Sequence, residues 1–87
     1  MRVRIRGKCW DLSFTRTPDD ADGICDPPTA PNKRIRISHS LRGEKQLDAV
    51  IHELLHSAMW DLDEVAINDT ATDIARVLWR LGYRKNG

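Results

Sequence analysis

The chain lacks the features that mark membrane, secreted or disulfide-rich proteins. No apolar run approaches the length of a membrane-spanning helix, and the N-terminus has no apolar core of the kind found in signal peptides. The two cysteines, Cys9 and Cys25, form neither a C-x-x-C pair nor a disulfide framework. The net charge of +1 argues neither for nor against a polyanionic partner. These absences predict a cytoplasmic protein with reduced thiols and no membrane association.

The length of 87 residues predicts a single domain spanning residues 1–87. With 40% hydrophobic and 31% charged residues, the composition is ordinary for a globular protein. A chain this short buries a modest core, so a bound metal ion would help to hold it together.

Alternating charged and apolar residues predict short β-strands in the first half of the chain. Residues 2–6 alternate arginine with valine and isoleucine, and residues 9–14 follow after a turn at Gly7 and Lys8, so we expect a β-hairpin. Residues 15–33 are rich in proline and aspartate and predict a loop, in which residues 23–25 could add a very short strand.

The second half begins with one more predicted strand, at residues 34–37, and continues with two helices. The first helix is expected from about Glu44 to Trp60, with an apolar stripe toward the core at Leu47, Val50, Ile51, Leu54 and Ala58. Asp63 is a suitable N-cap for the second helix, which Gly82 ends. Its expected packing seam is Ile67, Ala71, Ile74, Leu78 and Leu81. The predicted fold is α+β: a small antiparallel sheet of about three strands, followed by two packed helices.

The stretch from His52 to His56 reads H-E-x-x-H inside the first predicted helix. Residues four apart lie on one helix face, so His52 and His56 can direct both imidazoles at one zinc ion. Glu53 lies about 100° further round the helix, where it can act as general base toward a water molecule. The alternative is a helix with two partly exposed histidines beside Trp60.

A catalytic zinc site normally has three protein ligands, and no histidine follows His56. The third ligand is therefore expected to be a carboxylate. Glu64 is favoured because it lies in the first turn of the second helix and shares the face that packs toward the first. Asp69 and Asp73 remain alternatives. A first-turn glutamate also complements the helix dipole without any metal.

Other polar residues are weaker candidates. Tyr83, Arg76 or Arg80 could stabilise an oxyanion, although each is more often a surface residue. His39 could line the cleft, and Asp48 could orient an imidazole.

Arginine alternates along the first and last predicted strands. If these strands share a sheet, one of its faces is basic. A solvated outer face is the simpler interpretation, and a nucleic-acid surface is the alternative. The arginines that define this face are Arg2, Arg4, Arg6, Arg34 and Arg36.

From residue 47 to 56, at 63–65 and from 73 to 82, the sequence resembles the short HExxH metallopeptidase-like proteins of phages and prophages. These are minimal zincins, loosely similar to the SprT-like and ImmA/IrrE-like families. The resemblance implies zinc held by His52, His56 and Glu64, with Glu53 as the catalytic base. It also implies that the strand at 34–37 forms the sheet edge along which a peptide lies, and that a phage-encoded protein would act in the host cytoplasm.

The expected function is that of a zinc-dependent metallopeptidase acting on a protein or peptide substrate. The competing hypothesis is a small zinc-stabilised module that cleaves nothing and binds protein, or binds nucleic acid through its arginines. The sequence does not set the oligomeric state.

Overall fold

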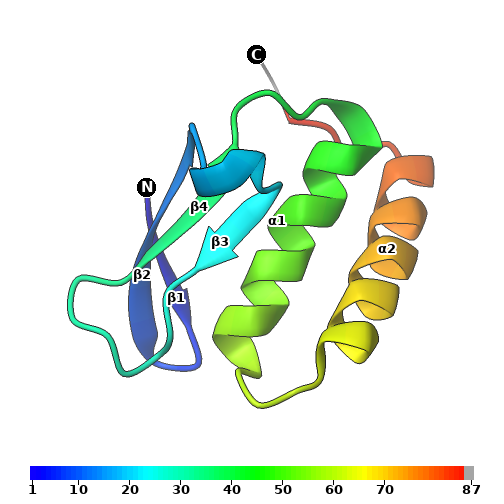
Figure 1. Cartoon of the computed structure of the whole chain (residues 1–87). Helices are drawn as coiled ribbons and strands as arrows, with labels where there is room; N and C mark the ends of the chain where they lie inside the picture. The colour runs from blue at the N-terminus through cyan, green and yellow to red at the C-terminus, as the bar shows by residue number, and fades with distance from the viewer. Residues whose placement is uncertain (86–87) are drawn as a thin grey trace.

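The computed structural model describes residues 1–85 and confirms the α+β fold (Figure 1). The strands are β1 (Arg2–Ile5), β2 (Lys8–Thr15), β3 (Gly23–Cys25) and β4 (Arg34–Ser38). A short 3-10 helix, η1 (Pro18–Asp20), precedes β3. The helices are α1 (Gly43–Ala58) and α2 (Glu64–Arg80). No helix within residues 1–85 is long and apolar enough to cross a membrane.

The described residues form a four-stranded sheet in the order β1-β2-β4-β3. The predicted count of about three strands becomes four because the optional strand at residues 23–25 forms, and one pairing is parallel where an antiparallel sheet was expected. The β1–β2 and β3–β4 pairs are antiparallel, but β2 and β4 are parallel. The cause is the route of the chain, which leaves β2, passes through η1 to the far edge of the sheet and forms β3 there. It then turns back, and β4 fills the space between β2 and β3.

This route also corrects the position of the last predicted strand. Residues 34–37 were expected at the sheet edge, but β4 lies inside the sheet, between β2 and β3. The edge beside α1 is instead formed by β3, which the sequence indicated only as an optional short strand.

The first hairpin turns one residue earlier than predicted. Arg6 and Gly7 both have positive φ, at 49° and 80°. Positive φ at both central residues matches the type I′ turn that the twist of a two-residue hairpin favours.

One face of the sheet packs against α1 and forms the core. The buried residues of this cluster come from β2, β4 and α1, and they are Trp10, Leu12, Ile35, Ile37 and Ala49. The Trp10 indole N–H donates to the carbonyl of Asp26 at 3.1 Å, so its polar atom is satisfied inside the core. Trp10 and Leu12 are therefore buried on one face of β2, as the alternation in the sequence predicts.

Helix α1 lies between the sheet and α2, which changes the face it buries (Figure 1). The predicted core stripe is only partly buried, and the most buried residues of α1 are Ala49, Glu53 and Ser57. A helix with neighbours on two sides has no single outer face, so the predicted stripe is not the only side that α1 buries.

Helix α2 begins as predicted and packs along a shifted seam. Asp63 is its N-cap, and the Asp63 carboxylate accepts from the Ala66 backbone N–H at 3.0 Å. Beyond Ile67 and Ala71, the buried stripe continues through Ala75, whereas Ile74 is 38% exposed. Leu81, also assigned to the seam, is 68% exposed. Alanines at the interface let the helices approach closely, and the Thr72 hydroxyl donates to Asp48 across it at 2.9 Å.

We expect Ala71→Leu to destabilise the protein by about 1–3 kcal/mol, because Ala71 is fully buried against α1 and three added carbons cannot fit without moving α2. Val77→Leu is the matched control on the exposed side of α2 and should change stability by less than about 0.5 kcal/mol. Urea unfolding of both variants measures the difference. Equal stability of the two variants would contradict this packing.

Candidate metal centre

The two motif histidines of α1 face each other across one helical turn. His52 Nε2 and His56 Nε2 lie 3.1 Å apart, and the ring centroids are 4.8 Å apart. Both side chains are mostly buried, with 17% and 18% exposed. The i, i+4 spacing therefore does what the sequence predicts, which is to bring two imidazole nitrogens to one point.

Glu64 completes the cluster from the first turn of α2. Its Oε1 lies 2.9 Å from His52 Nε2, and its Oε2 lies 3.0 Å from His56 Nε2. The short connection at residues 59–63 and the Asp63 cap place this turn beside the C-terminal end of α1. Of the carboxylates considered from the sequence, Glu64 is the one that the fold brings to the histidines.

The donor set fits a tetrahedral zinc ion. Bonds of about 2.0–2.1 Å at tetrahedral angles hold ligand atoms roughly 3.3 Å apart. The histidine nitrogens lie 3.1 Å apart, and each lies 2.9–3.0 Å from a different oxygen of the Glu64 carboxylate. Taken with one ligand atom per residue, the three groups lie within 4.8 Å of one another. Two facing imidazole nitrogens can share only one proton, which leaves other lone pairs of the cluster without a donor. A cation bound by all three residues would satisfy these lone pairs. Two imidazoles and a carboxylate form a ligand set typical of catalytic zinc.

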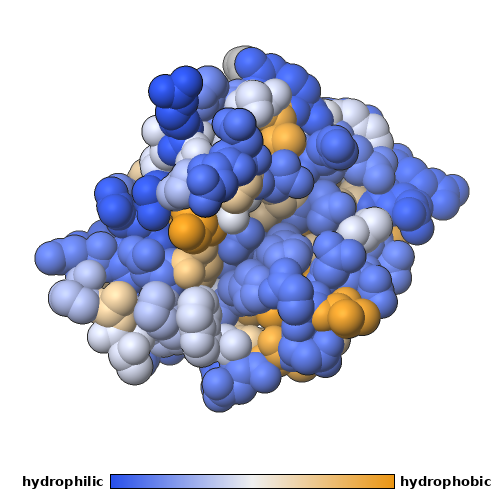
Figure 2. Space-filling model, viewed as in Figure 1, coloured by the Kyte–Doolittle hydropathy of each residue, from blue (hydrophilic) through white to orange (hydrophobic). Residues whose placement is uncertain are grey.

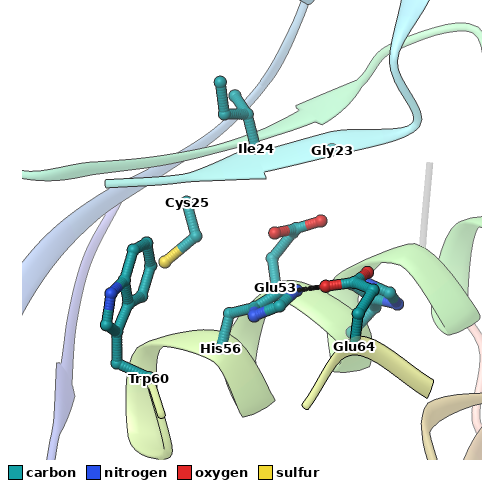
Figure 3. Close-up of a pocket in the computed structure, with 8 residues that line it drawn as sticks. Gly23, Ile24, Cys25, Glu53, His56, Trp60 and Glu64 are labelled. Carbon is teal, nitrogen blue, oxygen red and sulfur yellow. Dashed lines mark hydrogen bonds and ion pairs between the residues drawn. The ribbon is translucent and has the colours of Figure 1, made fainter. Parts of the chain in front are cut away.

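Glu53 lies outside this cluster and points from α1 toward β3 (Figure 3). The residue is only 7% exposed. A Cβ atom built on Gly23 would lie 2.8 Å from Glu53 Cγ and 2.9 Å from Glu53 Oε2. Any larger residue at this position of β3 would therefore displace the carboxylate, so glycine is what lets the strand pass over it.

The surroundings of Glu53 favour its protonated form. The pKa of Glu53 is raised to about 7, chiefly by burial; the charge of His52 opposes this rise and the negative charge of Glu64 adds to it. A carboxylic acid that titrates near neutrality can both accept and return a proton at physiological pH. This is the property that a general base in hydrolysis requires.

A cavity of about 240 Å³ opens between β3 and the two helices. It is lined by Gly23, Ile24, Cys25, His52, Glu53, His56, Trp60 and Glu64. The Cys25 side chain points from β3 toward Trp60, whereas the Ile24 side chain points away (Figure 3). Burial raises the pKa of Cys25 to about 12, with the charges of Glu53 and Asp26 adding to the effect, so this thiol is neutral.

The face of the molecule that carries β3, α1 and α2 is predominantly hydrophilic, with apolar residues in scattered patches (Figure 2). The cavity therefore combines a polar surrounding surface with an indole and a neutral thiol on its wall.

The weaker sequence candidates lie elsewhere. None of His39, Tyr83, Arg76 and Arg80 lines the cavity formed by the described residues. Asp73 pairs with Arg76 at 3.5 Å, and Asp69 is exposed outside the cluster. Asp48 accepts from Thr72 rather than from an imidazole.

Sequence reasoning missed the contribution of β3. Gly23 and Cys25 were given only as part of an optional short strand with no role in the site, although they form one wall of the cavity. A glycine in a short predicted strand is a signal for close approach of another group, and it is the one feature that could have indicated this wall.

Comparisons of the chain with protein-family models, with curated proteins and with solved structures found no match. The geometry of the cavity and its ligand cluster therefore carries the functional proposal.

We expect the metal-free protein, kept in chelator, to lose stability as pH rises from about 4.5 to about 7. The folded state holds the Glu53 proton up to pH 7, whereas the unfolded chain releases it near the ordinary value of 4.5. The unfolded state therefore binds fewer protons in this window, and the penalty should reach on the order of 2–3 kcal/mol above it. Denaturant unfolding across pH measures the effect.

Glu53→Gln is the control for this assignment, since glutamine has no proton to release. Its stability should fall less over the same pH window and exceed that of the parent protein at pH 8. Identical pH profiles for the two proteins would show that Glu53 titrates normally.

Proposed function

We propose that this protein is a zinc-dependent metallopeptidase that hydrolyses peptide bonds. His52, His56 and Glu64 would hold the ion, and Glu53 would act as the general base. The observation that carries this proposal is the convergence of His52, His56 and Glu64, whose ligand atoms all lie within 4.8 Å of one another. Beside them lies the buried carboxylic acid of Glu53, whose pKa is raised to about 7. A reducing compartment such as the cytoplasm belongs to the same proposal, because both cysteines are free thiols.

Zinc in such a site supplies Lewis acidity, which acidifies water and polarises a substrate carbonyl. The role of the chain is to hold groups around that chemistry. Glu53 takes the proton of the attacking water and passes it to the leaving amine nitrogen. Its position under β3 keeps the carboxylate out of the ligand set and beside it, which is what distinguishes a base from a fourth ligand.

Strand β3 offers a place for an extended peptide substrate. The Asp22 carbonyl and the Asp26 N–H form hydrogen bonds with β4. Because these bonds alternate along an antiparallel pair, the N–H and C=O groups of Gly23 and Cys25 face the open edge. A substrate could pair with this edge as an added strand, with its carbonyl near the metal ligands. The proposed peptide-binding edge is therefore β3, in place of the strand at 34–37 that the resemblance implied.

The same site could instead hold zinc for structural reasons alone, as in a binding module. The burial of Glu53 beside the ligand cluster favours the catalytic function over the structural one. A structural ion needs four ligands and gains nothing from a buried, unpaired carboxylic acid at its side. Burying such a group costs stability, and that cost is typical of groups kept for chemistry.

We expect the protein to bind about one zinc ion per chain and Glu64→Gln to weaken zinc binding at least about 100-fold. Loss of a group that only orients a ligand already costs 10- to 100-fold, so loss of a ligand should cost more. Asp69→Asn on the exposed side of α2 is the matched control and should bind zinc normally. Titration against a zinc-chelating dye measures the affinities. A protein that takes up no zinc would refute the site.

We expect Glu53→Gln to retain zinc and to lose at least about 100-fold in the hydrolysis of labelled casein, because general bases contribute about 100- to 10,000-fold. Glu44→Gln makes the same change at the other end of α1 and should keep full activity. If the parent protein binds zinc but Glu53→Gln cleaves casein equally well, Glu53 is not the base.

A further inference from the structure

The sheet face that points away from α1 carries a set of arginines. Trp10 and Leu12 of β2 point toward the helices, so their neighbours along the strand point outward. The strand register then shows which arginines lie on this outward face, since directly opposed residues share a face. Arg2 and Arg34 both oppose Asp11, Arg4 opposes Cys9, and Ser13 opposes Arg36. We name this the basic sheet face, and it consists of Arg2, Arg4, Arg34 and Arg36. Arg6, which the sequence also assigned to this face, lies in the hairpin turn after β1, and its guanidinium donates to the Ala58 carbonyl at 2.8 Å.

The four arginines form two rows. Arg2 and Arg4 lie along β1, and Arg34 and Arg36 lie along β4. Within a row the Cα atoms are roughly 6.6 Å apart, and two strand spacings separate the rows by about 9.5 Å. Between them runs β2, whose outward side chains are small.

A trough therefore lies between the arginine rows. One end of it is a hollow of about 670 Å³. The residues that line this hollow are Arg2, Cys9, Trp10, Asp11, Asn32, Lys33 and Arg34.

Few acidic groups neutralise this face. Within residues 1–85, none of the four guanidinium groups forms a salt bridge. Asp11 is the acid between the rows, and Asp26 is engaged by the backbone N–H of Arg34 at 2.8 Å. The whole chain has 14 basic and 13 acidic side chains, so its charge is nearly balanced while this face is not. Such segregation favours a polyanionic partner.

We propose that the basic sheet face binds single-stranded nucleic acid through its sugar-phosphate backbone. Guanidinium groups bind phosphate oxygens in a bidentate manner, and the four side chains that define this face are all arginines. The width of the trough suits one strand, flanked by a row of arginines on each side. This binding is independent of the candidate metal centre, whose residues belong to α1 and α2 on the other side of the sheet (Figure 1).

The face also predicts how binding depends on sequence and salt. Its outward side chains on β1, β2 and β4 include no aromatic ring, so bases have no stacking platform and base preference is weak. Four phosphate contacts to a single strand predict a log–log salt slope of about −3. At about 50 mM salt, the same relation means that each phosphate contact increases the affinity roughly tenfold.

The test is fluorescence anisotropy of a labelled oligothymidylate of about 20 nucleotides, titrated with the full chain at several salt concentrations. We expect measurable binding with a slope of about −3. The double variant Arg4→Gln/Arg36→Gln removes one arginine from each row and should bind about 100-fold more weakly at 50 mM salt, with a slope near −1.5.

The matched control is Lys45→Gln/Arg80→Gln, which removes the same charge from the exposed surfaces of α1 and α2 and should bind like the parent protein. Thermal unfolding checks that both double variants are folded. An equal loss in both would show that only net charge matters and would overturn the proposal. So would tighter binding of a duplex of the same length, or equal competition by polyglutamate, which would point to an acidic protein as the partner.

Discussion

The packing of α1 against the sheet on one side and α2 on the other is the constraint on which the candidate metal centre depends. A histidine pair on a helix supplies two ligand atoms and no more. The third comes from α2 only because alanines at the interface, Ala71 and Ala75, let that helix lie close to α1. The short connection then brings Glu64 to the end of α1 where His56 lies. The helix interface thus sets the ligand geometry.

The buried carboxyl group of Glu53 shows a second constraint, imposed by β3. An acid with 7% exposure and a pKa near 7 weakens the fold at neutral pH, and residues 1–85 provide no ion pair to offset it. Gly23 makes room for this group at the cost of a side chain that could have extended the core. Local sacrifices of stability of this kind are typical of catalytic positions, where the environment that disfavours a charge also tunes its chemistry.

The two faces of the sheet have different chemistry. The inner face holds the core and supports α1, and its open edge at β3 adjoins the cavity. The outer face is polar and rich in arginine because no helix within residues 1–85 covers it. A partner could occupy the outer face without blocking the cavity, so the proposed peptidase site and the proposed nucleic-acid surface are compatible in one small chain.

The sequence alone determined the features that depend on local spacing. The helix period placed His52 and His56 together, the Asp63 cap fixed where α2 starts, and alternation identified β1, β2 and β4. The sequence favoured Glu64 but left Asp69 and Asp73 open, because the choice depends on how α2 rotates against α1, and the predicted seam was wrong at Ile74 and Leu81. Only the tertiary structure decided that β2 and β4 are parallel and that β3 is the edge over the cavity. Pairing between distant strands follows the route of the whole chain, and three residues such as Gly23–Cys25 carry too little local pattern to specify it.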